Sequence, residues 1–315
     1  DACKRFNQET SRDWIQLWRQ PVLNLLGRAD PAAGSPPCRL IGESYDERVM
    51  IPFYQKEMNK TVMYYIFINK LILSYLFQEF DQAVNNAETA EQYLEGVTGF
   101  EIFPLFHYYD SLAKLAVYPN VATPEQEQIL KKVAANQEKL GNWARHAPMN
   151  YRHKFYLVEA ERAWVLNKDG DAREYYDHAI DGARDNGYLN DEALACELAG
   201  RFYVAKGRNR LAEVYLRDAH YVYQRWGALA KVKHLEQQYP ELLKGSLEGQ
   251  RPRPTPSKGT VGITAQALDI QTILKASHTL AGEIVLPKLL KKMMWIVIEN
   301  AGAEKGFLVL PRVDI

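Results

Sequence analysis

The feature that most constrains this chain is an internal repeat in which small residues recur at matching places. Shifting the sequence by 40 residues aligns small residues with small ones and two larger residues with their like: Ala160 with Gly200, Ala172 with Ala212, Ala179 with Ala219, Gly187 with Gly227, Tyr175 with Tyr215 and Leu189 with Leu229. Small side chains let two helices cross closely, while larger ones fill the seam between successive hairpins. The repeat therefore predicts helical hairpins stacked into a solenoid.

Helical periodicity runs from Thr10 to about Pro240, and strand patterns are absent from this region. The connections are short and contain Gly, Asn, Asp or Pro, as in Asn186-Gly187, which is typical of antiparallel helical hairpins. We predict an all-α domain over residues 1–244. Its amphipathic helices are expected at residues 61–78, 80–94, 103–118, 123–144, 152–166, 172–186, 190–206 and 208–224.

The later copy of the repeat follows the tetratricopeptide order G-x-x-Y…A-x-x-x-F…A, in Gly200, Tyr203, Ala212, Leu216 and Ala219. A weaker third copy lies upstream, with small residues at Ala83, Ala87 and Ala90. The tryptophan and the final proline of the pattern are missing, and the repeat is longer than the usual length of about 34 residues. We therefore expect a tetratricopeptide-like solenoid, with a generic α-solenoid as the alternative.

Two features of the first 80 residues also concern helices. A helix that carries Trp14, Leu17 and Trp18 is expected to begin near Thr10, and Pro21 is expected to kink or end it. The most apolar stretch, residues 61–80, is interrupted by Asn69, Lys70, Gln78 and Glu79. A membrane-spanning helix needs about 20 mostly apolar residues, so we expect a buried helix here and no membrane insertion.

The composition favours a globular intracellular protein. Hydrophobic residues make up 47% of the chain, and 39 basic residues balance 39 acidic ones, so a nucleic-acid partner is not expected. The cysteines Cys3, Cys38 and Cys196 lie far apart without a C-x-x-C pair, which predicts neither a disulfide framework nor a structural zinc site. We therefore expect a cytoplasmic location.

Three further segments follow residue 244. Residues 245–266 are rich in Pro and Gly and are expected to form a flexible linker. Residues 267–284 predict a signalling helix that forms homodimers, because apolar residues recur on one narrow stripe: Ile270, Ile273, Leu274, Leu280 and Ile284. Residues 285–315 predict a helix and a strand at 306–310. A lone strand cannot satisfy its backbone groups, so we expect the natural polypeptide to continue.

The predicted interaction site is the concave groove that the first helices of tetratricopeptide hairpins line. The repeat alignment places eight residues there: Lys154, Leu157, Glu161 and Trp164 in one copy, and Leu194, Glu197, Arg201 and Val204 in the next. Charged side chains in such a groove can clamp a peptide or a neighbouring domain. Alternatively, Glu161 and Arg201 form a solvated pair worth less than about 1 kcal/mol.

Motifs for catalysis, cofactors or metals are not expected in this chain. His278 sits in Ser277-His278-Thr279 as a histidine-kinase phosphoacceptor does, but Thr279 replaces the usual acid, which favours a solvent-facing histidine. Residues 167–171 resemble half of a calcium loop without the required glycine and glutamate spacing. His146 and His153 are too far apart in sequence for one helical metal site. Phosphate-binding glycine loops are absent from the sequence.

Several stretches resemble the very large bacterial multi-sensor signalling kinases. These are residues 106–113, 153–163, 199–239 and 267–310. That family combines a serine/threonine kinase, a predicted ATPase, helical repeats, a GAF sensory domain and a histidine kinase. The resemblance implies that residues 285–315 begin a GAF domain, and that the ATP-binding and kinase domains of this two-component signalling protein lie outside the chain. Proteins of that family commonly have Gln at the position of His278, so the resemblance implies no phosphoacceptor role for this histidine.

Two functions remain open at this point. The first is a non-catalytic module that relays signals and contacts other domains of the same polypeptide, namely the ATPase, GAF and kinase domains, or protein partners. The alternative is a stand-alone tetratricopeptide-type scaffold that binds peptides, as a co-chaperone adaptor does. That scaffold needs a clustered basic clamp, whereas Lys154 and Arg201 are interrupted by Glu161 and Glu197.

Overall fold

The computed structural model describes residues 9–29, 37–97 and 99–243, all within one compact unit, Asp1–Arg251. The predicted linker, the stripe of residues 270–284 and the GAF-like segment lie outside the described residues. Within them the elements are α2 (Glu9–Leu25), α3 (Glu47–Lys56), α4 (Lys60–Leu76), α5 (Phe80–Glu91), η2 (Leu94–Val97), α6 (Phe103–Val117), η3 (Tyr118–Asn120), α7 (Thr123–His146), α8 (Pro148–Val165), α9 (Asp169–Asp185), α10 (Leu189–Ala205), α11 (Asn209–Trp226) and α12 (Leu229–Gln238).

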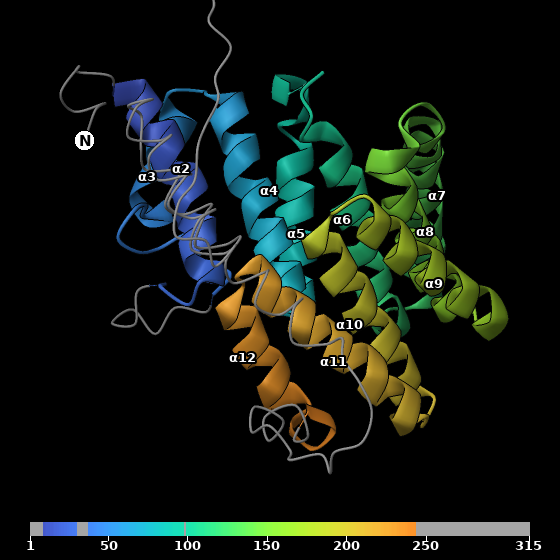
Figure 1. The fold of residues 1–315 in the computed structure, drawn as a ribbon. Helices are drawn as coiled ribbons and strands as arrows, with labels where there is room; N and C mark the ends of the chain where they lie inside the picture. The colour runs from blue at the N-terminus through green and yellow to red at the C-terminus, as the bar shows by residue number, and fades with distance from the viewer. Residues whose placement is uncertain (1–8, 30–36, 98, 244–315) are drawn as a thin grey trace, which may run out of the picture. The chain divides into compact units, whose positions relative to one another are not determined.

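The helices pack as consecutive hairpins. The pairs α4 with α5, α8 with α9 and α10 with α11 make the most extensive helix contacts, and a short turn joins the two helices of each pair (Figure 1). In the described part of the chain, β pairing is limited to an isolated bridge between Ile41 and Asp46. The all-α prediction is therefore confirmed. Among the described helices, none has the length and apolar character to cross a membrane.

The predicted helices from residue 61 to residue 224 all form, with ends that differ by a few residues from those expected. The sequence pattern did not reveal α3 or α12, which are both short. Of the two effects expected of Pro21, a kink or an end of the first helix, the end is wrong, because α2 continues to Leu25. A proline inside a helix removes one backbone hydrogen bond, and here the buried side chains of Leu17 and Leu23 flank it on α2.

The turns between the last helices repeat one geometry every 20 residues. Asn167, Gly187, Gly207 and Gly227 all have positive φ values, of 57°, 76°, 67° and 88°. After each of them the next backbone N–H donates to the carbonyl five residues earlier, as from Lys168 to the Ala163 oxygen at 2.9 Å. This is the Schellman ending, in which a left-handed residue closes a helix. It sets the common length of α8 to α11.

The aligned small residues lie where the helices of each hairpin cross. Ala160, Ala172, Ala179, Ala212 and Ala219 are all buried. At Gly200 on α10, a Cβ atom would lie 2.7 Å from Cγ of Leu216 on α11. Because such a distance is well inside van der Waals contact, only glycine permits this approach of the two helix axes. The packing reason given for the repeat is confirmed at these positions.

Helices α4, α6, α8 and α10 form a contiguous layer, in which α6 contacts both α4 and α8, and α8 contacts α10. We call these four the inner helices. In α10 nearly every side chain from Asp191 to Tyr203 is buried, whereas α5, α9 and α11 alternate buried and exposed positions. Helix α12 also packs against α2, where Ala230 approaches Gly27. Inner helix α4 also contacts α2 and α3, so elements that precede it in the sequence pack against it.

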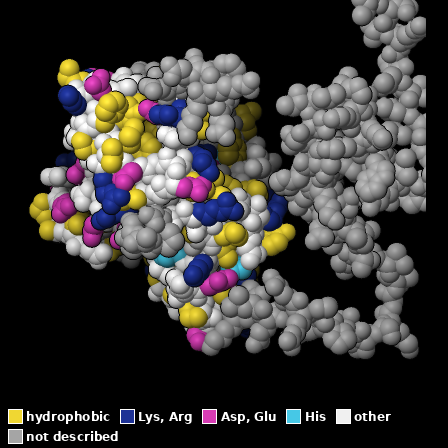
Figure 2. All heavy atoms as spheres, turned by 90° about the vertical axis from the view of Figure 1, so that its left-hand side faces the viewer, with side chains coloured by type: hydrophobic (Ala, Val, Ile, Leu, Met, Phe, Trp, Pro, Cys, Tyr) yellow, Lys and Arg dark blue, Asp and Glu magenta, His cyan; other side chains and the backbone are white. Residues whose placement is uncertain are grey.

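The outer surface near the start of the unit carries exposed apolar side chains. On α2 these are Ile15, Trp18 and Val22, whose spacing of three and four residues puts them on one face. On α3 they are Val49 and Phe53. Figure 2 shows this side of the molecule, where hydrophobic side chains lie among lysines, arginines and acidic residues of both α2 and its neighbours. The charges are mixed, without a field of one sign.

Candidate functional site

The eight predicted groove residues lie on the inner helices α8 and α10, but most of them are not accessible. Five are buried, with at most 4% of the residue's surface exposed: Lys154, Leu157, Glu161, Leu194 and Glu197. The other three are partly buried: Trp164, Arg201 and Val204. These five residues are too buried to line an open groove, although Glu161 still borders a pocket described below. The physical reason is that neighbouring helices pack against α8 and α10, and that the side chains of Lys231 on α12 and Gln78 after α4 reach Glu197.

Glu197 is the centre of a buried ionic cluster that joins four helices, α4, α10, α11 and α12. Its carboxylate accepts hydrogen bonds from the Tyr223 hydroxyl at 2.7 Å, from Nζ of Lys231 at 2.7 Å and from Nε2 of Gln78 at 3.1 Å. Lys231 is fully buried and also donates to the Leu76 carbonyl at the end of α4. Burial alone would raise the pKa of Glu197, but the Lys231 charge and these hydrogen bonds lower it. Burial lowers the pKa of Lys231.

Glu161 lies near this cluster in a less compensated environment. The Tyr176 hydroxyl donates a hydrogen bond to its Oε1. Burial raises the pKa of Glu161, and neither the nearby Arg201 charge nor the Tyr176 hydrogen bond offsets this effect. Arg201 makes no direct ion pair with a carboxylate of the described residues. Its guanidinium carbon instead lies over the Phe80 ring, 5.1 Å from the ring centre, which is a cation–π contact.

A pocket of about 550 Å³ opens beside these two charged groups. Its volume falls in the range of about 300–1,000 Å³ that small-molecule sites occupy. Its walls come from the end of α6, η3, the start of α7, the end of α8 and the middle of α10, and they include three of the predicted groove residues, Glu161, Trp164 and Arg201. The accessible remnant of the predicted groove is therefore this pocket, which we call the Arg201 pocket.

Lys154, which was predicted to face a groove, belongs to a second buried cluster. Its Nζ lies 2.8 Å from Oδ2 of Asp191, and Nε2 of His153 lies 2.9 Å from the same oxygen. The Lys154 ammonium also lies 4.4 Å from the centre of the Tyr188 ring. Burial would raise the pKa of Asp191, but Lys154 and His153 lower it. This cluster joins α8 to α10, and the charges of Lys154 and Asp191 compensate each other. Nδ1 of His153 is buried there without a hydrogen-bond partner.

A third buried polar cluster connects α6 to α7. Nδ1 of His107 lies 2.8 Å from Oδ1 of Asn136, whose Nδ2 donates to Oδ2 of Asp110 at 2.8 Å. Lys114 pairs with Asp110 at 3.3 Å. Burial lowers the pKa of His107, so the neutral imidazole is favoured. The cluster contains Ser, His and Asp, the residue types of a catalytic triad. The likeness ends there, because the Ser111 hydroxyl donates its hydrogen bond to a backbone carbonyl of its own helix at 2.7 Å.

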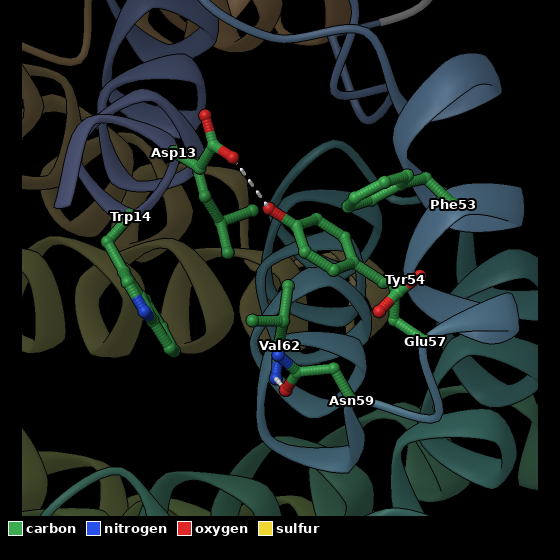
Figure 3. A pocket seen from close by; sticks show the side chains of 8 residues that line it. Asp13, Trp14, Phe53, Tyr54, Glu57, Asn59 and Val62 are labelled. Carbon is green, nitrogen blue, oxygen red and sulfur yellow. Dashed lines mark hydrogen bonds between the residues drawn. The ribbon is translucent and has the colours of Figure 1, made fainter. Parts of the chain in front are cut away.

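A smaller pocket, of about 310 Å³, lies between α2, α3 and α4 (Figure 3). The Tyr54 hydroxyl donates to Oδ2 of Asp13 across it at 3.3 Å. Burial and the Asp13 charge raise the pKa of Tyr54 to about 12. Trp14 and Val62 supply apolar wall, and Asn59 caps α4 below (Figure 3). The lining residues of this pocket include no cationic side chain, and its two carboxylates are those of Asp13 and Glu57.

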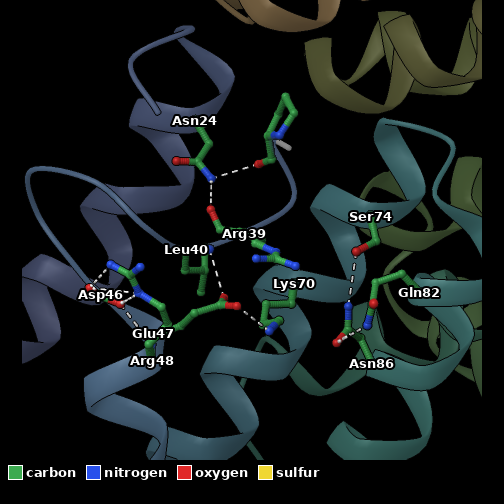
Figure 4. A network of polar contacts seen from close by, with 11 residues as sticks. Asn24, Arg39, Leu40, Asp46, Glu47, Arg48, Lys70, Ser74, Gln82 and Asn86 are labelled. Atoms are coloured by element: carbon green, nitrogen blue, oxygen red, sulfur yellow. Dashed lines mark hydrogen bonds and ion pairs between the residues drawn. The ribbon is translucent and has the colours of Figure 1, made fainter. Parts of the chain in front are cut away.

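Next to this pocket, a polar network fastens the loop before α3 to its neighbours (Figure 4). Glu47 accepts a hydrogen bond from the Leu40 amide at 2.9 Å and pairs with Lys70 of α4 at 2.8 Å. Asn24 of α2 donates to the carbonyls of Pro37 and Arg39. Because every one of these groups has a partner within the unit, the network is structural. In the described part of the chain, no group of three or more His, Cys, Asp or Glu residues could hold a metal ion.

Sequence reasoning found Glu161, Trp164 and Arg201 but missed the residues that close the groove. Lys231 and Gln78 lie 34 and 119 residues from Glu197, and repeat alignment carries no information about contacts across such distances. A usable signal did exist in α4, where residues 62–68 are apolar all around the helix. A helix that is hydrophobic on every face is buried on every face, which argues against an open concave side.

Comparison with known proteins gives one short similarity. No known family matches the chain, and no solved structure resembles it significantly. The chain is 52% identical over 44 residues to hybrid signal transduction histidine kinase G of Dictyostelium discoideum. The similar stretch is 14% of this chain and spans about 1% of the length of that kinase. The similarity links part of the chain to a signalling kinase and leaves its repeat type and its domain neighbours open.

Proposed function

We propose that this chain is a non-catalytic interaction and relay module of a multidomain signalling kinase. The observation that carries the proposal is the 52% identity over 44 residues with a hybrid histidine kinase. The fold supports it, because stacked helical hairpins present a large contact surface without requiring chemistry of their own. On this proposal its partners are other parts of the same polypeptide, including ATPase, GAF and kinase domains.

The buried Glu197 cluster provides a route for the relay. Helix α12 lies only a few residues before the predicted linker and signalling helix. Through Lys231 it is bonded both to Glu197 on α10 and to the Leu76 carbonyl at the end of α4. A displacement of α12 would therefore leave a buried lysine and a buried glutamate unpaired, which is strongly unfavourable. Such a contact favours two discrete positions of α12 over a gradual displacement of this helix.

The stand-alone scaffold remains the alternative from another class. It requires basic side chains that face a peptide in an open groove. Lys154 is buried against Asp191, and Arg201 is the cation that reaches the remaining pocket among the predicted groove residues. A single accessible arginine does not form the clustered clamp that the scaffold needs, so the observations favour the relay module.

The relay is tested by comparing the full chain with a chain that ends at residue 244. Sedimentation is expected to show a dimer for the full chain and a monomer for the shorter one. Hydrogen exchange at α12, α10 and the end of α4 is then expected to differ between the two, because dimer formation shifts the position of α12. If both chains are monomers, or if exchange in these helices is the same, the relay proposal is wrong.

A further inference from the structure

Arg201 in the pocket is a cation with unused hydrogen-bonding capacity. A guanidinium group has five N–H donors in a planar fork. Among the described residues, no acceptor is hydrogen-bonded to those donors, and the guanidinium lies over the Phe80 ring. Burial lowers the pKa of Arg201, but the nearby Tyr75, Glu161 and Glu197 raise it. The Phe80 ring covers one face of the group and leaves the N–H edge for another partner. Because a partly buried cation without acceptors is unfavourable, the pocket is expected to hold an anionic group at this position.

Glu161 supplies the opposite charge in the same pocket. One of its oxygens accepts the Tyr176 hydroxyl, and in the described structure the other has no hydrogen-bond partner. Glu161 and Arg201 influence each other electrostatically but form no direct ion pair, although both line the Arg201 pocket. The pocket therefore has a free acceptor for a cation and a free donor fork for an anion.

The rest of the pocket lining is mixed: Tyr118, Gln126 and Asn167 contribute polar groups, and the remaining residues are apolar. Leu115, Ala116, Trp164 and Val165 form its apolar wall. The adjacent charges are already compensated, since Glu197 is paired with Lys231. A ligand with a net charge would unbalance this neutral surrounding, whereas a zwitterion would not.

We propose that the Arg201 pocket binds a free α-amino acid with an apolar side chain. The ligand carboxylate accepts hydrogen bonds from the Arg201 fork, and its ammonium group donates to the free oxygen of Glu161. The side chain lies against Trp164 and Leu115. The pocket volume of about 550 Å³ accommodates an amino acid of this size. This inference concerns a small ligand and does not depend on the relay role proposed above.

Titration calorimetry of the full chain tests the proposal with L-leucine and L-phenylalanine as probes. At least one of them is expected to bind. N-acetyl-L-phenylalanine lacks the ammonium group and L-phenylalaninamide lacks the carboxylate, so each is expected to bind at least about tenfold more weakly. These comparisons use the unaltered protein and are independent of any effect of mutation on folding.

Variants then assign the two ends of the ligand. Arg201→Gln and Glu161→Gln are each expected to weaken binding at least about tenfold. Arg210→Gln, at an exposed position on α11, is the matched control and should keep the original affinity. Absence of heat with either amino acid at millimolar concentration would overturn the proposal. Equally tight binding of N-acetyl-L-phenylalanine would also overturn it, because the site would then recognise an anion alone.

Discussion

Glu161 and Glu197 are both buried on inner helices, yet their surroundings shift their pKa values in opposite directions. Glu197 has a lysine and two neutral donors at hydrogen-bond distance, which together outweigh its loss of hydration. Glu161 has one hydroxyl donor and a more distant arginine, which do not. The difference indicates that Glu197 has a structural role, whereas Glu161 retains the capacity to bind a ligand.

The structural role of Glu197 predicts a large loss of stability when its charge is removed. Glu197→Gln leaves Lys231 buried without a counter-ion, and we expect the free energy of unfolding to fall by about 3–5 kcal/mol. Glu161→Gln is the matched control, because the neutral side chain removes a charge that burial disfavours. Its stability in urea denaturation should equal or exceed that of the unaltered protein. A smaller loss for Glu197→Gln than for Glu161→Gln would contradict this assignment.

The same pair predicts a pH dependence. The folded pKa of Glu197 lies below the ordinary value of 4.5, so its stabilising contribution is complete above pH 4.5 and is lost as the pH falls through the folded pKa. The folded pKa of Glu161 lies above 4.5, so its ionisation reduces stability as the pH rises through that folded pKa. The stability difference between the unaltered protein and Glu197→Gln should therefore shrink in urea titrations below pH 4.5. A difference that grows there would contradict the ion pair.

At the scale of single residues, the sequence indicated which positions face inward but not which side chains they contact. Repeat alignment correctly placed Glu161, Trp164 and Arg201 on one side of successive helices, where they line a common pocket. It could not predict that Lys231 neutralises Glu197 or that Asp191 neutralises Lys154, because those partners lie on helices whose packing was not known. A charged residue on an inner face has the same sequence pattern whether it is solvated or buried.

At the scale of elements, the regular turns explain why the last four hairpin helices are so similar in length. Each of them ends at a left-handed residue, and three of these four are glycines. Glycine adopts positive φ without the steric conflict that a Cβ atom introduces. The hydrophobic pattern and these turn residues together made the helices from residue 61 to residue 224 predictable. The short α3 and α12, of 10 residues each, carry too few turns of periodicity to be recognised.

Close packing of α10 on α11 predicts the effect of adding one methyl group. Gly200→Ala places a Cβ atom within 3.0 Å of the Leu216 side chain. We expect the free energy of unfolding to fall by about 1–3 kcal/mol, the range for overpacked cores. Gly170→Ala, in the first turn of α9 with open space around its Cβ position, should leave stability unchanged or raise it slightly. Thermal unfolding of both variants measures this, and equal stability of the two would contradict the crossing geometry.

On the scale of the described unit, helices far apart in the sequence meet. Helix α12 contacts α2, and Lys231 reaches the Leu76 carbonyl across 155 residues. An isolated pair of hairpins cannot reveal such contacts, because they depend on how much each successive hairpin rotates relative to the last. The sequence therefore predicted the repeats and their stacking, whereas the coverage of the inner helices emerged only from the assembled fold. This coverage turns an expected groove into a pocket and gives α12 contact with both ends of the repeat.

Cysteine labelling under native conditions tests directly whether the inner face of α8 and α10 is buried. Leu157→Cys and Leu194→Cys place thiols on the predicted groove side of α8 and α10, and Val214→Cys places one at an exposed position of α11. With labelling followed by mass spectrometry of each peptide, the thiol at position 214 should react promptly. The thiols at positions 157 and 194 should react only when the protein unfolds in urea. Prompt labelling of the two inner thiols in folded protein would show an open groove and contradict the structure described for this chain.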